Sequence, residues 1–208
     1  ALKKHPKWLI GFSDLTAFCI AAYKAGSASI HGPMAISWNG KTAYVTSRAH
    51  LRASLMGEPP TYTYAPGTPE RLRTGKATGR LIGGNLSILS QLIGTPDDFD
   101  TDGCILFIED IDEYLYHIDR MMVHLKRSGK LKKLAGLIVG GFADLKDNDV
   151  PFGKTVEEIV LDAVGEADFP ICFGFPTGHT PQNYPLVHGA TATLSVSHSH
   201  VELKMEMH

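Results

Sequence analysis

The sequence is poor in features that mark several classes of protein. Its 208 residues hold only three cysteines, Cys19, Cys104 and Cys172, which lie far apart and form no CxxC pair. An odd number of isolated cysteines in apolar stretches argues against a disulfide framework and is typical of buried thiols in a reducing compartment. No apolar run reaches the roughly 18 residues that a membrane span needs, and the first residues do not resemble a signal peptide. We therefore expect a cytoplasmic protein.

The sequence also lacks an excess of charge of either sign. Twenty lysines and arginines stand against 22 acidic residues, which gives a formal net charge of -2, and the basic residues are scattered. Such a chain has no strongly positive surface that would attract nucleic acid or an anionic membrane, so neither is expected as a partner. Repeats and low-complexity segments are absent too. With 43% hydrophobic residues, the chain can bury a large core without disulfides or a metal.

Short apolar runs alternate with segments of helical period, which predicts an α/β fold. Strands are expected at 8–11, 27–30, 80–83, 104–108, 134–139 and 171–173, and helices at 15–23, 42–56, 85–92, 111–125 and 156–164. An antiparallel pair of strands is expected at 191–196 and 200–205.

A proline-rich stretch divides the chain, because four of its 12 prolines lie between Gly57 and Pro69. We predict that 1–56 is the remainder of an N-terminal domain, 57–74 a linker and 75–208 a C-terminal domain. The first strand begins almost at residue 1, so we expect the start of the first domain to be missing.

Ser13 lies where the first predicted strand ends and the first helix begins, in Gly11-Phe12-Ser13-Asp14. A hydroxyl at this position projects from the carboxyl end of a sheet, and the N–H groups that follow favour an anion. This is the geometry of a nucleophile elbow, although Leu15 replaces the second glycine of G-x-S-x-G. The alternative is that Ser13 or Asp14 is an ordinary N-cap.

A serine nucleophile needs a base and a group that orients the base. Glu109 ends the buried strand predicted at 104–108, where a carboxylate is not a casual surface group. The neighbouring Asp110 and Glu113 fit a capping box for the following helix. That pattern favours Glu109 as the free carboxylate and leaves Glu113 as the alternative.

His179 is the histidine best placed to act as the base. It lies in a loop rich in glycine and proline, directly after the strand predicted at 171–173, where catalytic groups tend to be presented. His31 is a second loop histidine that follows a strand. His198 and His200 could share one face of a strand as a metal pair, but no third ligand has a usable spacing. We therefore expect no metal, and because a triad of this type needs no cofactor, we expect none.

Six motifs in order resemble the LD-carboxypeptidase (muramoyltetrapeptide carboxypeptidase) family of serine peptidases. They are Leu9–Thr16, His31–Met34, Gly79–Leu86, Leu92–Thr95, Phe107–Ile111 with Ile118–Arg120, and Gly178–His179. The resemblance covers most of the chain. It implies a Rossmann-like N-terminal domain that carries the serine, and a mixed α/β C-terminal domain that supplies a glutamate and a histidine. It also implies a homodimer.

Transferred to these motifs, the family pattern implies that Ser13 is the nucleophile, His179 the general base and Glu109 the group that holds the imidazole. The N–H of Asp14 would be one oxyanion donor, and Asn85 and His31 would line or brace the substrate site. The family has a long segment before the serine strand that has no counterpart here. We expect either a fragment of a longer protein, or a first residue that follows a cleavage or a disordered region.

The implied reaction is hydrolysis of the L,D-amide bond that releases the terminal D-alanine of a murein tetrapeptide, as in peptidoglycan recycling. Three alternatives stay open. One is a related microcin C-type immunity peptidase, which cleaves an amide between a peptidyl aspartate and a nucleotide. Another is a non-catalytic module that binds murein peptides. The third, an α/β-hydrolase esterase, shares the order serine, glutamate, histidine, but the absent G-x-S-x-G and the linker count against it.

Overall fold

The computed structural model describes residues 4–5, 7–35, 44–67 and 69–206. The strands are β1 (Ile10–Gly11), β2 (Ser29–His31), β3 (Tyr62–Tyr64), β4 (Gly75–Asn85), β5 (Cys104–Ile111), β6 (Gly136–Ala143), β7 (Ile171–Cys172), β8 (Leu186–His188), β9 (Thr191–Val196) and β10 (Val201–Glu206). The helices are α1 (Thr16–Lys24), α2 (Val45–Leu55), α3 (Leu86–Leu92), α4 (Leu115–Arg127) and α5 (Val156–Val164), with 3₁₀ turns η1 (Ser13–Leu15) and η4 (Pro69–Arg71).

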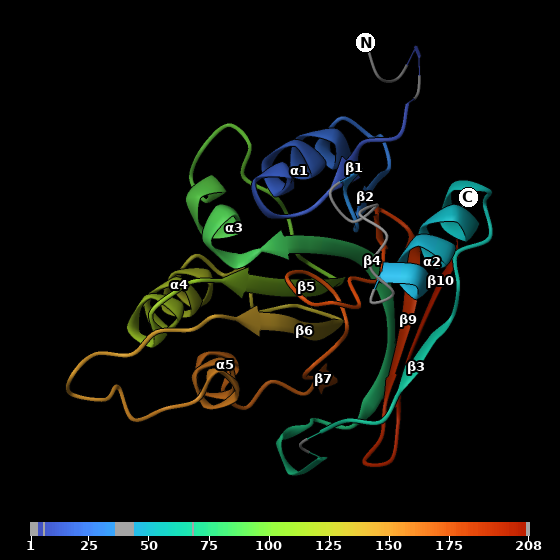
Figure 1. Cartoon of the computed structure of the whole chain (residues 1–208). Coiled ribbons are helices and arrows are strands. Elements are labelled where there is room, and N and C mark those ends of the chain that lie inside the picture. Colours follow the sequence, from blue (N-terminus) through green and yellow to red (C-terminus); the bar gives the residue numbers. More distant parts are fainter. Residues whose placement is uncertain (1–3, 6, 36–43, 68, 207–208) are drawn as a thin grey trace.

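A seven-stranded mixed sheet forms the centre of the molecule, in the order β3-β10-β9-β4-β5-β6-β7 (Figure 1). β4 to β7 run parallel, whereas β3, β10 and β9 are antiparallel to their neighbours. The long strand β4 joins the two halves. Its first residues pair with β9 and its last residues, up to Asn85, pair with β5. Asn85 and Glu109 are therefore direct neighbours at the carboxyl end of the parallel strands.

A second sheet of three strands, β1-β2-β8, holds the start of the chain against its later part. β1 and β2 are parallel, and β8 pairs with β2 in the antiparallel sense. The fully buried His188 strengthens this junction. Its Nε2 lies 2.9 Å from the carbonyl oxygen of Gly83 in β4, and its Nδ1 lies 3.2 Å from the hydroxyl of Ser29.

Two apolar cores lie on opposite faces of the large sheet. One contains buried side chains of α1, α3, α4 and α5, including Ile20, Leu89, Met122 and Val160. The other contains Leu51 of α2 together with residues of β2, β8, β9 and β10. The helical period of the sequence produces the first core, because the residues at steps of three and four along α4 all face the sheet.

The structure confirms the mixed α/β fold, and most of the expected elements lie within a few residues of their predicted bounds. Residues 57–74 are less irregular than expected, because β3 and η4 form there and β3 pairs with β10. β8 was not expected. The division into domains and the Rossmann-like character of the first of them stay predictions, and residues 42 and 43 of the second predicted helix lie outside the described residues.

Candidate functional site

Ser13 lies in a strained turn between β1 and α1. Its φ is +61°, a left-handed conformation that costs a residue with a side chain about 1–3 kcal/mol. The prediction that Ser13 or Asp14 is an ordinary N-cap is wrong. Phe12 precedes the 3₁₀ turn and Leu15 precedes α1, and no side chain caps either start. The strained turn therefore leaves Ser13, which is half-buried, without a helix-capping role, as in a nucleophile elbow.

The close packing of this turn explains why a glycine precedes it by two residues. A Cβ at Gly11 would overlap the Leu15 side chain, which folds back over β1. Leu15, which replaces the second glycine of the usual elbow motif, thus packs against Gly11 and supports the turn. The start of α1 is fixed to the large sheet as well. The Thr16 hydroxyl accepts a hydrogen bond of 3.0 Å from the backbone N–H of Asn85, at the end of β4.

Glu109 and His179 meet at the carboxyl end of the parallel strands. The Glu109 side chain is fully buried near the end of β5, and its Oε2 lies 2.6 Å from His179 Nδ1. The same oxygen accepts the backbone N–H of His179 at 3.2 Å. Two donors from one residue therefore fix the carboxylate, and Nε2 is the ring nitrogen left for chemistry.

The loop that carries His179 is built to bring it onto Glu109. Gly178 has a φ of +88°, and a Cβ there would overlap the Glu109 carboxylate. The side chain of Asn183 accepts the N–H of Gly178 at 3.0 Å, and Thr177 O accepts the N–H of Gly141 at 3.0 Å, which ties the loop to β6. Only glycine at position 178 allows this approach.

The charge of the pair favours a protonated imidazole. Burial lowers the pKa of His179, but the hydrogen bond and the charge of Glu109, helped by the charge of Asp110, outweigh burial and raise that pKa above its ordinary value. A histidine with a raised pKa holds a proton more readily once it has accepted one. This is the property that a general base needs when it takes a proton from a hydroxyl.

Phe12 connects the serine turn to the histidine. Its ring centroid lies 4.8 Å from that of His179, in an edge-to-face arrangement. Ser13 is thus adjacent to a residue that touches His179, although among the described residues no hydrogen bond joins the Ser13 hydroxyl to the imidazole. Asp14 follows in the same turn with an exposed side chain.

His31 is fully buried at the end of β2 and packs behind Phe12, 6.2 Å between ring centroids. Neither ring nitrogen has a hydrogen-bond partner among the described residues. Burial, with the nearby His188 and His179, holds the pKa of His31 well below its ordinary value. The ring therefore braces the Phe12 side of the turn as a neutral group.

Asp110 does not cap the following helix, so the predicted capping box is wrong. β5 extends to Ile111 through a shift of register against β6, and α4 starts only at Leu115. The buried Asp110 carboxylate instead accepts the side-chain amide of Asn85 and the backbone N–H of Ser87, both at 2.9 Å. Burial, together with the charge of Glu109, raises its pKa to about 6.

Asn85 and Glu113 are also placed by this arrangement. The side-chain oxygen of Asn85 accepts the N–H of Ile88 and caps α3, so Asn85 fixes the helix beside Glu109. Glu113, the alternative acid, lies 2.9 Å from His117 and makes no hydrogen bond with His179. The geometry therefore pairs Glu109, not Glu113, with the predicted base.

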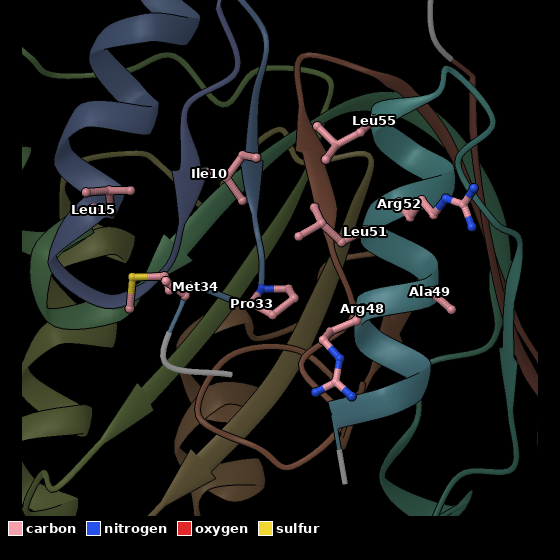
Figure 2. A pocket seen from close by; sticks show the side chains of 10 residues that line it. Ile10, Leu15, Pro33, Met34, Arg48, Ala49, Leu51, Arg52 and Leu55 are labelled. Atoms are coloured by element: carbon pink, nitrogen blue, oxygen red, sulfur yellow. The ribbon is translucent and has the colours of Figure 1, made fainter. Parts of the chain in front are cut away.

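A cavity of about 880 Å³ borders the serine turn. Figure 2 shows the side chains that surround it, which come from β1, residues 33–35 and α2, and Leu15 of the turn lines it as well. The walls are mostly apolar, and Arg48 and Arg52 contribute the charged groups. Such a space suits the uncharged part of a ligand near Ser13.

No group of three potential metal ligands gathers among the residues that the structure describes. His200, one of the two histidines considered as a metal pair, has its Nδ1 3.0 Å from the hydroxyl of Ser197 in an exposed turn. Within the same residues, no helix has both the length and the apolar character that a membrane crossing requires.

Sequence reasoning missed several residues of the site. Nothing marked Phe12 as the contact between the serine turn and His179. The positive φ of Gly178 leaves a signal in the sequence, a glycine directly before the histidine, but its reason is the tertiary approach to Glu109. The role of Asp110 was hidden by a helix-start pattern that fits the sequence and does not form.

Two protein-family models match the chain. The LD-carboxypeptidase C-terminal domain matches residues 78–194, and the LD-carboxypeptidase N-terminal domain matches residues 1–32. The chain is 36% identical over 202 residues to a probable murein peptide carboxypeptidase of Bacillus subtilis, covering 94% of this chain and 62% of the relative. It thus spans about three fifths of the length of such relatives.

Solved structures agree with these matches. The chain is similar to muramoyltetrapeptide carboxypeptidase from Oxalobacter formigenes, with a TM-score of 0.88 and 29% identity over 100% of this chain and 70% of the other. It is also similar to the microcin C7 self immunity protein MccF, with a TM-score of 0.83 and 21% identity over 99% of this chain and 69% of that protein. The second likeness shows a shared fold alone.

Proposed function

Because the chain belongs to the LD-carboxypeptidase family, we propose that it carries the triad of a serine peptidase that releases the terminal D-alanine of murein tetrapeptide. The bond cleaved is the amide between an L-centre and that D-alanine. The observation that carries the proposal is the hydrogen bond of 2.6 Å between the buried Glu109 and His179, beside a serine with a strained backbone.

In this mechanism the Ser13 hydroxyl attacks the carbonyl carbon of the amide. His179 Nε2 takes the hydroxyl proton and later gives it to the leaving amine of D-alanine. An acyl-enzyme forms on Ser13, and water then releases the shortened peptide by the same proton transfers. Glu109 holds the imidazole through Nδ1 and stabilises its charged form.

The backbone N–H of Asp14 is the proposed oxyanion donor, because it follows the nucleophile in the turn, as in other serine elbows. Asn85 and His31 act on the site by bracing it. Asn85 caps α3 beside Glu109, and His31 supports Phe12. Loss of an oxyanion donor of this kind lowers kcat by about 10²–10³.

The experiment that tests the proposal measures release of D-alanine from murein tetrapeptide by the protein that carries this chain. Ser13→Ala is expected to lower kcat at least about 10³-fold, because the acyl-enzyme of this mechanism forms on the Ser13 hydroxyl. The exposed Ser199 provides the matched control, and Ser199→Ala is expected to keep the wild-type rate. Unchanged D-alanine release by Ser13→Ala would refute the assignment.

A parallel incubation with an aspartyl-adenylate analogue addresses the microcin-type alternative. Cleavage of this analogue without D-alanine release from the tetrapeptide would show that the substrate is a nucleotide amide and not a murein peptide. If the protein binds the tetrapeptide and cleaves neither compound, the non-catalytic module is the correct account. The 36% identity to a probable murein peptide carboxypeptidase favours the first substrate.

The family resemblance extends the proposal to a homodimer that acts on free murein peptides in the cytoplasm, without a cofactor. Sedimentation analysis of the protein at micromolar concentration tests the assembly. A mass that stays at one chain throughout would refute the dimer and leave the proposed chemistry intact.

A further inference from the structure

Three side chains around the proposed triad hold buried polar atoms that have no hydrogen-bond partner among the described residues. These atoms are Oε1 of Glu109, Nδ2 of Asn183 and both ring nitrogens of His31. Asn183 is 3% exposed, and the other two residues are fully buried. Buried polar atoms in native proteins nearly always have a partner, either a protein group or an ordered water. The three residues therefore point to a shared partner.

A series of contacts places His31 near the carboxylate. The His31 ring packs on Phe107, with 5.0 Å between ring centroids. Phe107 and Glu109 lie two residues apart in β5, so their side chains share one face of the strand. On the other side, Phe12 packs against both His31 and His179, and His179 contacts Glu109. His31 therefore lies on the face of the large sheet that carries Glu109.

Asn183 approaches the same carboxylate from the loop that carries the proposed base. Its Oδ1 accepts the Gly178 N–H at 3.0 Å, and a Cβ at Gly178 would overlap the Glu109 carboxylate. The amide and the carboxylate thus lie against one glycine. Two residues further on, Pro185 packs on Gly32, where a Cβ would lie 3.0 Å from the Pro185 Cα. The segment that starts at Asn183 therefore runs from the carboxylate to the end of β2, where the unpaired histidine lies.

The unpaired atoms are complementary in their hydrogen bonding. The oxygen of a charged Glu109 only accepts, and Nδ2 of Asn183 only donates. Burial, with the nearby His188 and His179, holds the pKa of His31 well below its ordinary value, and a neutral ring donates through one nitrogen. A single water accepts from two such donors and donates to the carboxylate, which is the usual number of about three hydrogen bonds for a buried water.

We propose that one buried water joins Glu109 Oε1 to the side chains of His31 and Asn183. His31 and Asn183 are then positioning residues, because they hold one carboxylate oxygen through the water while the other oxygen holds His179. The water also stabilises part of the negative charge of Glu109, so that less of this charge acts on the imidazole. The effect on activity rests on the proposed function, whereas the presence of the water does not depend on the substrate.

A crystal structure of the protein that carries this chain, at a resolution that shows ordered water, tests the site itself. One water is expected within hydrogen-bond distance of Glu109 Oε1, Asn183 Nδ2 and one ring nitrogen of His31. A structure without this water, or one in which these atoms bond to other protein groups, would overturn the inference.

The pH dependence of kcat/KM for D-alanine release tests the effect on His179. His31→Phe keeps an aromatic ring and removes both nitrogens, so the carboxylate loses part of its stabilisation and His179 holds its proton more firmly. The acid limb is expected to move to higher pH by about half a unit, which lowers kcat/KM about three-fold on that limb. Asn183→Ala is expected to move the limb in the same direction, and the double variant little further, because both residues act through one water. Asp110 and His188, which also ionise near this pair, are unchanged in these variants.

Two matched controls leave the water in place. His50 in α2 also has a buried ring nitrogen without a partner among the described residues, but its ring packs on Tyr184, with 4.6 Å between centroids. His50→Phe and the exposed Asn148→Ala are expected to keep the wild-type acid limb. A limb that stays in place in His31→Phe, or that moves equally in His50→Phe, would overturn the inference while the proposed function stands. If the wild-type protein releases no D-alanine, the proposed function is refuted and the crystal structure alone decides the inference.

Discussion

Glu109→Gln is expected to disable the proposed base, because Glu109 contacts His179 directly. Glu109→Gln keeps the size of the side chain and removes its charge. Oε2 accepts two N–H groups of His179, whereas Oε1 is buried without a partner among the described residues. The amide can place its oxygen or its NH₂ at the Oε2 position, and neither orientation restores the charged contact.

With the oxygen at that position, the NH₂ group is buried where nothing accepts it, which costs about 1–3 kcal/mol. With the amide reversed, the NH₂ group faces two donors, and the imidazole must take the tautomer that cannot accept a proton from Ser13. Loss of the charged hydrogen bond removes about another 1.5–3 kcal/mol from the protonated state of His179. The unpaired NH₂ group lowers the stability of the fold, whereas the lost charge and the wrong tautomer act on kcat and predict a fall of about 10-fold to 10⁴-fold.

The assay is D-alanine release from murein tetrapeptide as a function of pH. Glu109 raises the pKa of His179, and activity requires the neutral base, so wild-type activity is expected to fall as the pH drops through that raised value. In Glu109→Gln the acid limb is expected to move to lower pH. The exposed Glu166 gives the control, and Glu166→Gln should match wild type. A variant at position 109 with a rate within about three-fold of wild type and an unmoved acid limb would refute the reasoning.

Three further substitutions test the packing around the site. Gly178→Ala should lower kcat at least about ten-fold, because the new Cβ overlaps Glu109. Gly174 has a φ of +68° and free space around it, so Gly174→Ala should lower only the stability of the fold. Equal values of kcat for the two variants would refute the overlap. Asn85→Ala should lower the free energy of unfolding by about 1 kcal/mol or more through loss of the cap on α3, measured by urea denaturation. Burial lowers the pKa of His188 to about 4. The free energy of unfolding should therefore fall by up to about 3 kcal/mol as the pH drops from 6.5 towards 4. His188→Gln should flatten that part of the stability profile, and an unchanged slope would count against the buried neutral histidine.

The sequence allowed much of the fold to be predicted, because most elements have their own local signal. The steps of three and four in α4 and the continuous apolar run of β5 determine each element without reference to the rest of the chain. β8 escaped prediction because its three residues have no period of their own and pair with β2, more than 150 residues earlier. Pairing at such a distance is decided by tertiary packing.

The candidate site was predictable to a similar degree. Ser13, Glu109 and His179 each follow or end a predicted strand, and the structure joins the last two directly. The predicted start of α4 was wrong, because the D-x-x-E pattern that suggested a capping box is also compatible with a longer strand. Pairing of β5 with β6 favours the longer strand over the earlier helix start, and it buries Asp110 beside Asn85.

The most direct test of the central claim is to locate the serine that reacts with a fluorophosphonate. The protein that carries this chain would be labelled, digested and examined by mass spectrometry, in parallel with the His179→Ala variant. We expect an adduct on the peptide that contains Ser13 and much slower labelling of the variant. Labelling of another serine, or equal labelling of Ser13 without His179, would contradict the central claim.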